Sequence, residues 1–286
     1  MTPEHTAGLS TAERMRLFVR VGVFIALVLA GRFLFPIVLS PFGNTLVRSA
    51  LGTFAAAACA NAIVARGWEH GKLSDFGMGW TTESLRQLLT GIGSGAAAAI
   101  VIVLAGVALQ VAAISRNPSS PRDYGALSLL PIILMFGALG EELMFHGYAF
   151  QHLVRIVGEF ATVLPVGVLF GLAHMGNANV TWVGVLNTIA WGILLGYAYL
   201  RARSLWLPIG LHFGWNLALP LLGVNLSGFT MGLTGYELEW RTGPVWSGGA
   251  YGIEGGLCTT AIVIVLFALL PKIVKNSPER GFDSEV

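Results

Sequence analysis

Eight mostly apolar stretches, each close to the length of a membrane span, recur along this chain of 286 residues. A helix needs about 20 apolar residues to cross the hydrocarbon core of a bilayer. Only 11% of the residues are charged, whereas average soluble domains carry about 25%. The chain is therefore predicted to be an all-α, polytopic membrane protein with about eight transmembrane helices in one bundle. The predicted helices are residues 17–39, 46–65, 88–114, 126–154, 161–175, 181–200, 205–224 and 256–273.

The connections between these helices leave little room for a second folded unit, so residues 1–286 are predicted to form a single membrane domain. Within it, N-terminal helices (17–114) precede a core (126–224), and a C-terminal helix (256–273) follows a Gly-rich loop. The first apolar stretch continues past Arg32 without a small-x-small cleavage site, which favours a retained helix over a signal peptide.

Lys and Arg are distributed unequally between the two sides that eight crossings define. The side of the termini holds twelve of the 17 cations, the other side holds four, and Arg32 lies inside the first helix. Because cytoplasmic loops carry an excess of Lys and Arg, both termini are predicted to be cytoplasmic. The twelve are Arg14, Arg16, Arg20, Arg66, Lys72, Arg86, Arg155, Arg201, Arg203, Lys272, Lys275 and Arg280, and the four are Arg48, Arg116, Arg122 and Arg241.

Two adjacent glutamates, Glu141 and Glu142, lie in one of the most apolar stretches. A charged side chain at the centre of a spanning helix costs about 2.5–3.5 kcal/mol on insertion scales. His146 is the only basic residue within one helical turn, and it shares a face with Glu142. Intramembrane ionisable groups usually mark a functional site, so we interpret the pair as functional.

Other polar residues occur on two more apolar helices. His174 ends "LFGLAH", with Phe170 one turn before it, and "HFGWN" places His212 and Asn216 four residues apart. If their faces converge with Glu141, they form a polar chamber within the bilayer. A carboxylate can accept a proton from water, an imidazole can position water or bind a metal, and an amide can donate to an oxyanion. Taken alone, each histidine is more often a packing residue.

The depth of the chamber follows from helix geometry. Glu141 lies 14 residues before Arg155, which is about 21 Å along a helix. The chamber is therefore expected at mid-depth or slightly toward the side of Arg155, and open to that side.

Three motifs in this region resemble those of the CAAX-protease and bacteriocin-processing family of intramembrane proteases, also called the type II CAAX prenyl endopeptidase or Abi family. "EELMFHG" resembles the motif Glu-Glu-x-x-x-Arg-Gly, "FGLAH" resembles Phe-x-x-x-His, and "HFGWN" resembles His-x-x-x-Asn. The resemblance covers residues 126–224, which would then be a protease-like core. One position departs from it, because His146 stands where the family has Arg.

The resemblance implies an eight-helix fold and hydrolysis of a peptide bond in a membrane-associated protein or peptide by glutamate-activated water. It implies Glu141 as general base and His212 with Asn216 as oxyanion helpers, and His146 and Phe170 would support them. The resemblance leaves the cofactor open. It is either a divalent metal such as zinc, with Glu141, His174 and His212 as its ligands, or there is no cofactor. The implied catalytic residues are Glu141, Glu142, His174, His212 and Asn216.

Two alternatives stay open. The first is an inactive family member that acts as a membrane scaffold or immunity factor, and His146 in place of Arg keeps it open. The second is an ion transporter. It is less favoured, because the sequence shows no inverted repeat and the glutamates do not lie on a Gly/Pro-broken helix pair. The expected partners are the lipid bilayer and a membrane-associated peptide or protein. The sequence has no basic block of the kind that binds nucleic acid, and the spacing of Cys59 and Cys258 supports no metal site or disulfide.

Overall fold

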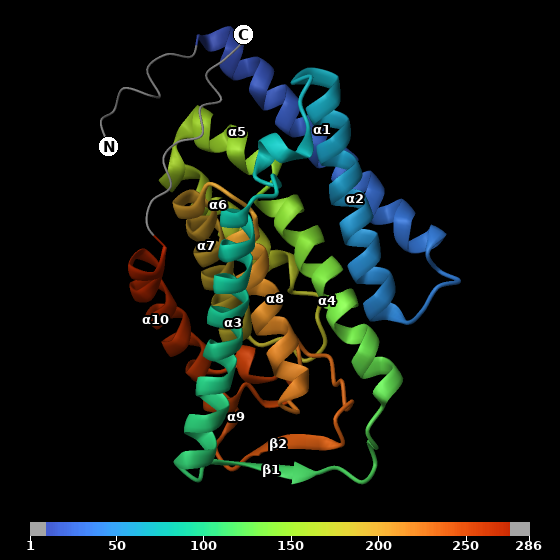
Figure 1. The fold of residues 1–286 in the computed structure, drawn as a ribbon, viewed down its shortest axis with the longest axis vertical. Coiled ribbons are helices and arrows are strands. Elements are labelled where there is room, and N and C mark those ends of the chain that lie inside the picture. The colour runs from blue at the N-terminus through green and yellow to red at the C-terminus, as the bar shows by residue number, and fades with distance from the viewer. Residues whose placement is uncertain (1–9, 275–286) are drawn as a thin grey trace.

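A computed structural model describes residues 10–274 as a helical bundle with one small antiparallel sheet (Figure 1). The main helices are α1 (Thr11–Val38), α2 (Thr45–Trp68), α3 (Thr82–Ala108), α4 (Tyr124–Phe145), α5 (Tyr148–Val157), α6 (Glu159–Ala173), α7 (Trp182–Ala202), α8 (Trp206–Leu221) and α10 (Leu257–Ile273). The shorter elements are η2 (Leu73–Phe76), β1 (Ala112–Arg116), β2 (Tyr236–Trp240), α9 (Pro244–Ser247), η3 (Gly249–Tyr251) and η4 (Ile253–Gly255). Lys275 and Arg280, which contribute to the predicted orientation, lie outside the described residues.

The prediction of a polytopic helical membrane protein is confirmed. Within residues 10–274, five segments are long and apolar enough to cross a bilayer: α1, α2, α3, α7 and the segment Tyr124–Val157 that contains α4 and α5. The other predicted spans correspond to α6, α8 and α10, which have 15, 16 and 17 residues. They are shorter than the roughly 20 residues that a perpendicular span needs. Length and composition therefore support five of the eight predicted spans directly.

The prediction of an all-α fold is wrong in one respect. β1 pairs antiparallel with β2, from Ala112 opposite Trp240 to Arg116 opposite Tyr236. The predicted helix 88–114 therefore ends early, at Ala108, and the chain pairs its backbone groups with the 225–255 segment instead. Figure 1 shows this sheet at one end of the bundle, which we call the sheet end, and α5 at the other, which we call the α5 end.

The predicted continuous helix 126–154 is divided in two at His146 and Gly147. Asn61 of α2 joins the two parts. Its Nδ2 donates to the Leu143 carbonyl at 3.0 Å, and its Oδ1 accepts from the Tyr148 backbone N–H at 2.9 Å. A Cβ atom at Gly147 would lie 2.2 Å from the Leu143 carbonyl oxygen, so the break requires glycine. It allows α5 to fold across the end of the bundle (Figure 1).

Two pairs of glycines bring α3 and α8 into backbone contact. A Cβ atom at Gly91 or Gly95 of α3 would lie 2.4 or 2.1 Å from a carbonyl oxygen of α8. A Cβ atom at Gly210 or Gly214 of α8 would meet α3 carbonyls at 2.3 and 2.2 Å. Small residues spaced four apart allow this approach in membrane helices. The contact fixes α8, and with it His212, against the centre of the bundle.

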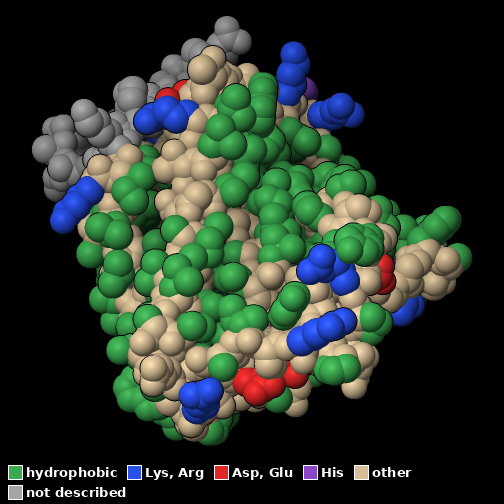
Figure 2. Space-filling view, turned by 60° about the horizontal axis from the view of Figure 1, so that its bottom comes forward, with side chains coloured by type: hydrophobic (Ala, Val, Ile, Leu, Met, Phe, Trp, Pro, Cys, Tyr) green, Lys and Arg blue, Asp and Glu red, His purple; other side chains and the backbone are tan. Residues whose placement is uncertain are grey.

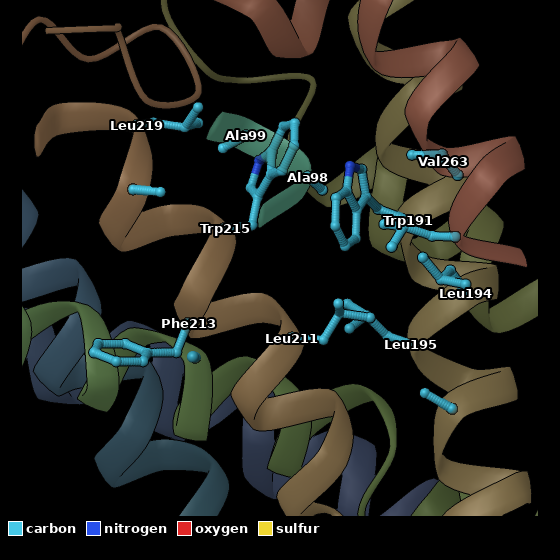
Figure 3. Packing of buried hydrophobic residues seen from close by; sticks show 14 of the residues in the cluster. Ala98, Ala99, Trp191, Leu194, Leu195, Leu211, Phe213, Trp215, Leu219 and Val263 are labelled. Atoms are coloured by element: carbon cyan, nitrogen blue, oxygen red, sulfur yellow. The ribbon is translucent and has the colours of Figure 1, made fainter. Parts of the chain in front are cut away.

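The main apolar core lies between α3, α7, α8 and α10 (Figure 3). Ala98 and Ala99 of α3 face two tryptophans, Trp191 of α7 and Trp215 of α8, whose ring centroids are 4.9 Å apart. Large apolar side chains also cover much of the outer surface (Figure 2), among them Phe160, which is 78% exposed. An exposed apolar surface of this extent is expected where lipid surrounds the helices.

Candidate active site

A cavity of about 200 Å³ lies where α1, α2, α4, α6, α7 and α8 meet. Its lining includes four of the five residues predicted to be catalytic, which come from α4, from the end of α6 and from α8. The four are Glu141, His174, His212 and Asn216. The structure thus brings together residues that are up to 75 positions apart, from Glu141 to Asn216.

Glu142 does not line the cavity but lies behind it, with no exposed side-chain surface. Its two carboxylate oxygens bind two histidines: Oε2 lies 2.7 Å from Nδ1 of His146, and Oε1 lies 2.8 Å from Nδ1 of His212. An ionised carboxylate can only accept, so Nδ1 of each ring carries the hydrogen. Glu142 therefore fixes the orientation of His212 and can balance a positive charge on that ring.

Glu141 faces the opposite way, into the cavity. Its Oε2 is 3.7 Å from Nε2 of His174 and 3.8 Å from Nε2 of His212, and it has no hydrogen-bond partner among the described residues. These distances are too long for direct hydrogen bonds. They leave a gap between one carboxylate oxygen and two imidazole nitrogens, which a small polar molecule such as water could bridge.

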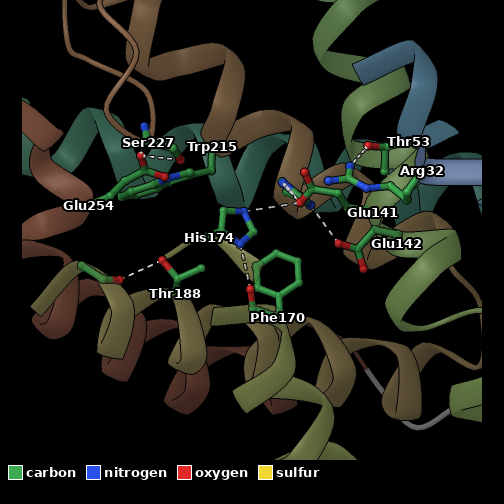
Figure 4. A network of polar contacts seen from close by, with 12 residues as sticks. Arg32, Thr53, Glu141, Glu142, Phe170, His174, Thr188, Trp215, Ser227 and Glu254 are labelled. Carbon is green, nitrogen blue, oxygen red and sulfur yellow. Dashed lines mark hydrogen bonds and ion pairs between the residues drawn. The ribbon is translucent and has the colours of Figure 1, made fainter. Parts of the chain in front are cut away.

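His174 is held at the end of α6. Its Nδ1 donates to the Phe170 carbonyl at 2.7 Å, which leaves Nε2 directed toward Glu141 (Figure 4). The Phe170 ring packs near both histidines, with its centroid 4.8 Å from that of His174 and 6.0 Å from that of His212. Phe170 therefore contributes both a backbone acceptor and a ring that packs beside the two imidazoles.

A divalent metal is the cofactor that the resemblance leaves open. Glu141, His174 and His212 have the ligand chemistry of a zinc site, in which one carboxylate and two imidazoles bind the ion. However, no group of three or more His, Cys, Asp or Glu within residues 10–274 is placed to hold a metal. The side chains as arranged therefore do not fit an ion.

The cavity extends from Glu141 toward the sheet end. Its outer lining includes Ser49 near the start of α2, Asn177 after α6 and Phe229 after α8. On the other side of Glu141, Leu143, Phe150 and Leu205 form part of a buried cluster, and α5 lies over that end. The lining thus extends away from Arg155, which differs from the expected opening toward that side, and α5 lies across the bundle there.

Sequence reasoning missed two charged residues that line the cavity. Arg32 lies inside the predicted first helix, and Glu254 lies in the Gly-rich loop before the predicted C-terminal helix. Glu254 is 9% exposed, and its carboxylate accepts hydrogen bonds from Trp215 Nε1 at 3.1 Å and Ser227 Oγ at 3.0 Å (Figure 4). Burial raises the pKa of Glu254. Arg32 is a charged residue inside an apolar stretch, which is a signal that the sequence offers. Nothing in the sequence around Glu254 gives such a signal.

The fold and the site define a class: a polytopic helical membrane protein with glutamates and histidines gathered inside the bundle. The sequence model of the type II CAAX prenyl endopeptidase Rce1-like family matches residues 123–218. The match runs from just before α4 into α8 and contains every residue predicted for the site. The resemblance based on the three motifs is therefore confirmed, and the match suggests an intramembrane peptidase. No curated protein matches the chain.

Proposed function

We propose that this chain is an intramembrane endopeptidase that hydrolyses a peptide bond of a membrane-associated protein or peptide with water activated by Glu141. One observation carries the proposal. The unpartnered Oε2 of Glu141 lies 3.7 and 3.8 Å from two imidazole nitrogens, in a cavity inside the bundle. A carboxylate without a partner at this position is suited to accept a proton.

The proposed reaction begins with a water molecule in the gap between Glu141, His174 and His212. Glu141 takes a proton from this water while the water oxygen attacks the carbonyl carbon of the substrate. His174 accepts a hydrogen bond from the water at Nε2, because its Nδ1–H is held by Phe170. The water is thereby oriented by two acceptors before it attacks.

The attack places negative charge on the former carbonyl oxygen. Asn216 would donate its amide N–H to this oxygen, and so would His212 when Nε2 carries a proton. Glu142 balances the charge of that protonated ring through its bond to Nδ1. When the carbon–nitrogen bond breaks, Glu141 returns its proton to the leaving amine. The products are a new carboxylate and a new amino terminus.

The test is hydrolysis of a peptide library by the purified protein in lipid vesicles. Glu141→Gln keeps the shape of the side chain but removes the base, and it should lower the rate about 10²–10⁴-fold. Glu83→Gln is the matched control, because Glu83 lies at the start of α3 outside the cavity. Equal rates for Glu141→Gln and wild type exclude Glu141 as the base. Absence of hydrolysis by wild type favours the inactive scaffold.

We also propose how many times the chain crosses the membrane and on which side its termini lie. The chain would form one membrane domain in which α6, α8 and α10 cross together with the longer helices, which makes eight spans and places both termini in the cytoplasm. The distribution of Lys and Arg supports this orientation, because ten of the twelve cations on the terminal side belong to the described residues and only four lie toward the sheet end. Cysteine tags at residues 5 and 284 test it. Labelling of either tag from outside intact cells contradicts the orientation.

A further inference from the structure

Arg32 is a cation on the wall of the cavity whose role the proposed reaction does not use. It lies on α1, where Gly31 packs against Ala56 of α2 so closely that a Cβ atom at position 31 would be 2.8 Å from the Ala56 Cβ. Arg32 Nη1 donates to the Thr53 hydroxyl, and Thr53 is buried. Figure 4 shows the side chain reaching from α1 toward the space beside Glu141. The guanidinium is thus held in place by the α1–α2 contact.

Arg32 has no ion pair with an acidic residue among residues 10–274, and its hydrogen-bond partner is a neutral hydroxyl. If its purpose were to balance Glu141, the two side chains would be expected to form an ion pair, yet Oε2 of Glu141 has no hydrogen-bond partner. A guanidinium has five N–H donors, so one bond to Thr53 leaves most of them available. Arg32 is exposed, so these remaining donors are accessible to an anionic ligand.

We propose that Arg32 is a specificity-determining residue that binds a carboxylate of the peptide substrate. The inference rests on the proposed function, since that function makes the ligand a peptide. The planar guanidinium matches a carboxylate with two parallel N–H bonds. Arg32 and Glu141 line the same cavity, so a peptide bound at Arg32 would pass the water-activating group.

The position of Arg32 favours a peptide over a lipid phosphate as the anion. The residue shares the cavity with Ser49 and Ala50 of α2 and with Gly137 of α4, which lie on the side of Glu141 that faces the sheet end. A substrate that enters by this route passes the guanidinium before it reaches the catalytic residues. A lipid headgroup held there would block the route.

The test measures binding, so that it does not depend on hydrolysis. The Glu141→Gln protein is placed in phosphatidylcholine nanodiscs and titrated with a short fluorescent apolar peptide that ends in a free carboxylate, and with its C-terminal amide. The acid should bind about 10–100-fold more tightly than the amide, as expected for hydrogen bonds between charged groups. Adding Arg32→Gln to the Glu141→Gln protein should abolish the preference for the acid and leave the affinity for the amide unchanged.

Arg48→Gln is the matched control, because Arg48 is also an arginine near the sheet end but does not line the cavity, and it should keep the preference. The inference is overturned if acid and amide bind alike, or if Arg32→Gln weakens both equally, which indicates a role toward Glu141 or the fold. Loss of the preference in phosphatidylglycerol nanodiscs also overturns it, in favour of a lipid phosphate. A preserved preference together with no hydrolysis by wild type rejects the proposed function while the Arg32 site stands.

Discussion

Two of the clusters that combine a carboxylate with histidine are built differently. In the first, at the α5 end, Glu69 Oε1 lies 2.7 Å from Arg20 Nη1, 3.0 Å from the Tyr148 hydroxyl and 3.3 Å from Nε2 of His152. We call these four residues the Glu69 cluster. The hydrogen bond from His152 contributes most to holding the pKa of Glu69 at about 2.

The second cluster, Glu141 with His174 and His212, has the same chemical groups at longer distances of 3.7 and 3.8 Å. We call it the Glu141 cluster. The Glu69 cluster joins α1, α2 and α5 through direct contacts, whereas the Glu141 cluster leaves a gap next to a cavity. The difference separates a cluster that stabilises the fold from one that can bind a reactant, because of these two carboxylates only Glu141 has a buried oxygen without a hydrogen-bond partner among the described residues.

The largest expected effect comes from the two histidines of the Glu141 cluster. His174→Ala and His212→Ala should each lower peptide hydrolysis about 10²–10⁴-fold, since each removes a group that faces the attacking water or the oxyanion. The two should differ in stability. His212→Ala also leaves one oxygen of the buried Glu142 unpaired, which costs about 1–3 kcal/mol. Thermal unfolding and single-turnover rates on the same preparations check both effects.

The comparison of the clusters fails if His152→Ala, in the Glu69 cluster, lowers hydrolysis as much as His174→Ala does. His152 lies at the α5 end and binds Glu69, so its loss should affect stability and leave the rate per folded molecule unchanged.

A smaller effect is expected at His146, which supports Glu142 from behind. His146→Gln should lower the rate about tenfold through loss of a charge-assisted hydrogen bond. His146→Arg should retain more activity than His146→Gln, because a guanidinium keeps a charged donor beside Glu142. The measurement is the rate of hydrolysis by the three proteins on one peptide. Equal rates for His146→Gln and wild type assign His146 a packing role.

Closing the cavity from the sheet end should lower the rate of hydrolysis less than His146→Gln does. Ser49 is exposed and lines the cavity, so a bulky maleimide on Ser49→Cys should slow hydrolysis several-fold. The background replaces Cys59 and Cys258 by Ala. Ser74→Cys is the control, since Ser74 is exposed in η2, away from the cavity. Equal loss on labelling either position contradicts a route from the sheet end.

The smallest effect concerns the Glu69 cluster. Glu69→Gln should lower the free energy of unfolding by about 1–2 kcal/mol without changing the rate of hydrolysis. The folded pKa of about 2 lies below the ordinary value of 4.5, so the contribution is present above pH 4.5 and is lost as the pH falls toward 2. Thermal unfolding of both proteins across this range should show the difference shrinking at low pH. A difference that stays constant with pH means that the charge of Glu69 is not its source.

Several properties of this protein follow from its sequence alone. The lengths of the apolar stretches predict the long helices, because a bilayer permits few other spanning structures and the requirement is local. The three motifs predict that Glu141, His174 and His212 approach one another, since a polar group on an apolar helix is stable only beside another polar group or water. The spacing of Glu142 and His146 likewise predicts their contact within one helical turn.

Other properties were decided only by the tertiary structure. Two adjacent glutamates differ because α4 packs with Glu142 toward the buried His146 and Glu141 toward the cavity. The break at Gly147 depends on Asn61, which is 82 residues away from Leu143, its partner across the break. Arg32 and Glu254 reach the site from the two ends of the chain. Such placements depend on which helices can approach closely, as α3 and α8 do through glycines, and no local pattern specifies that choice.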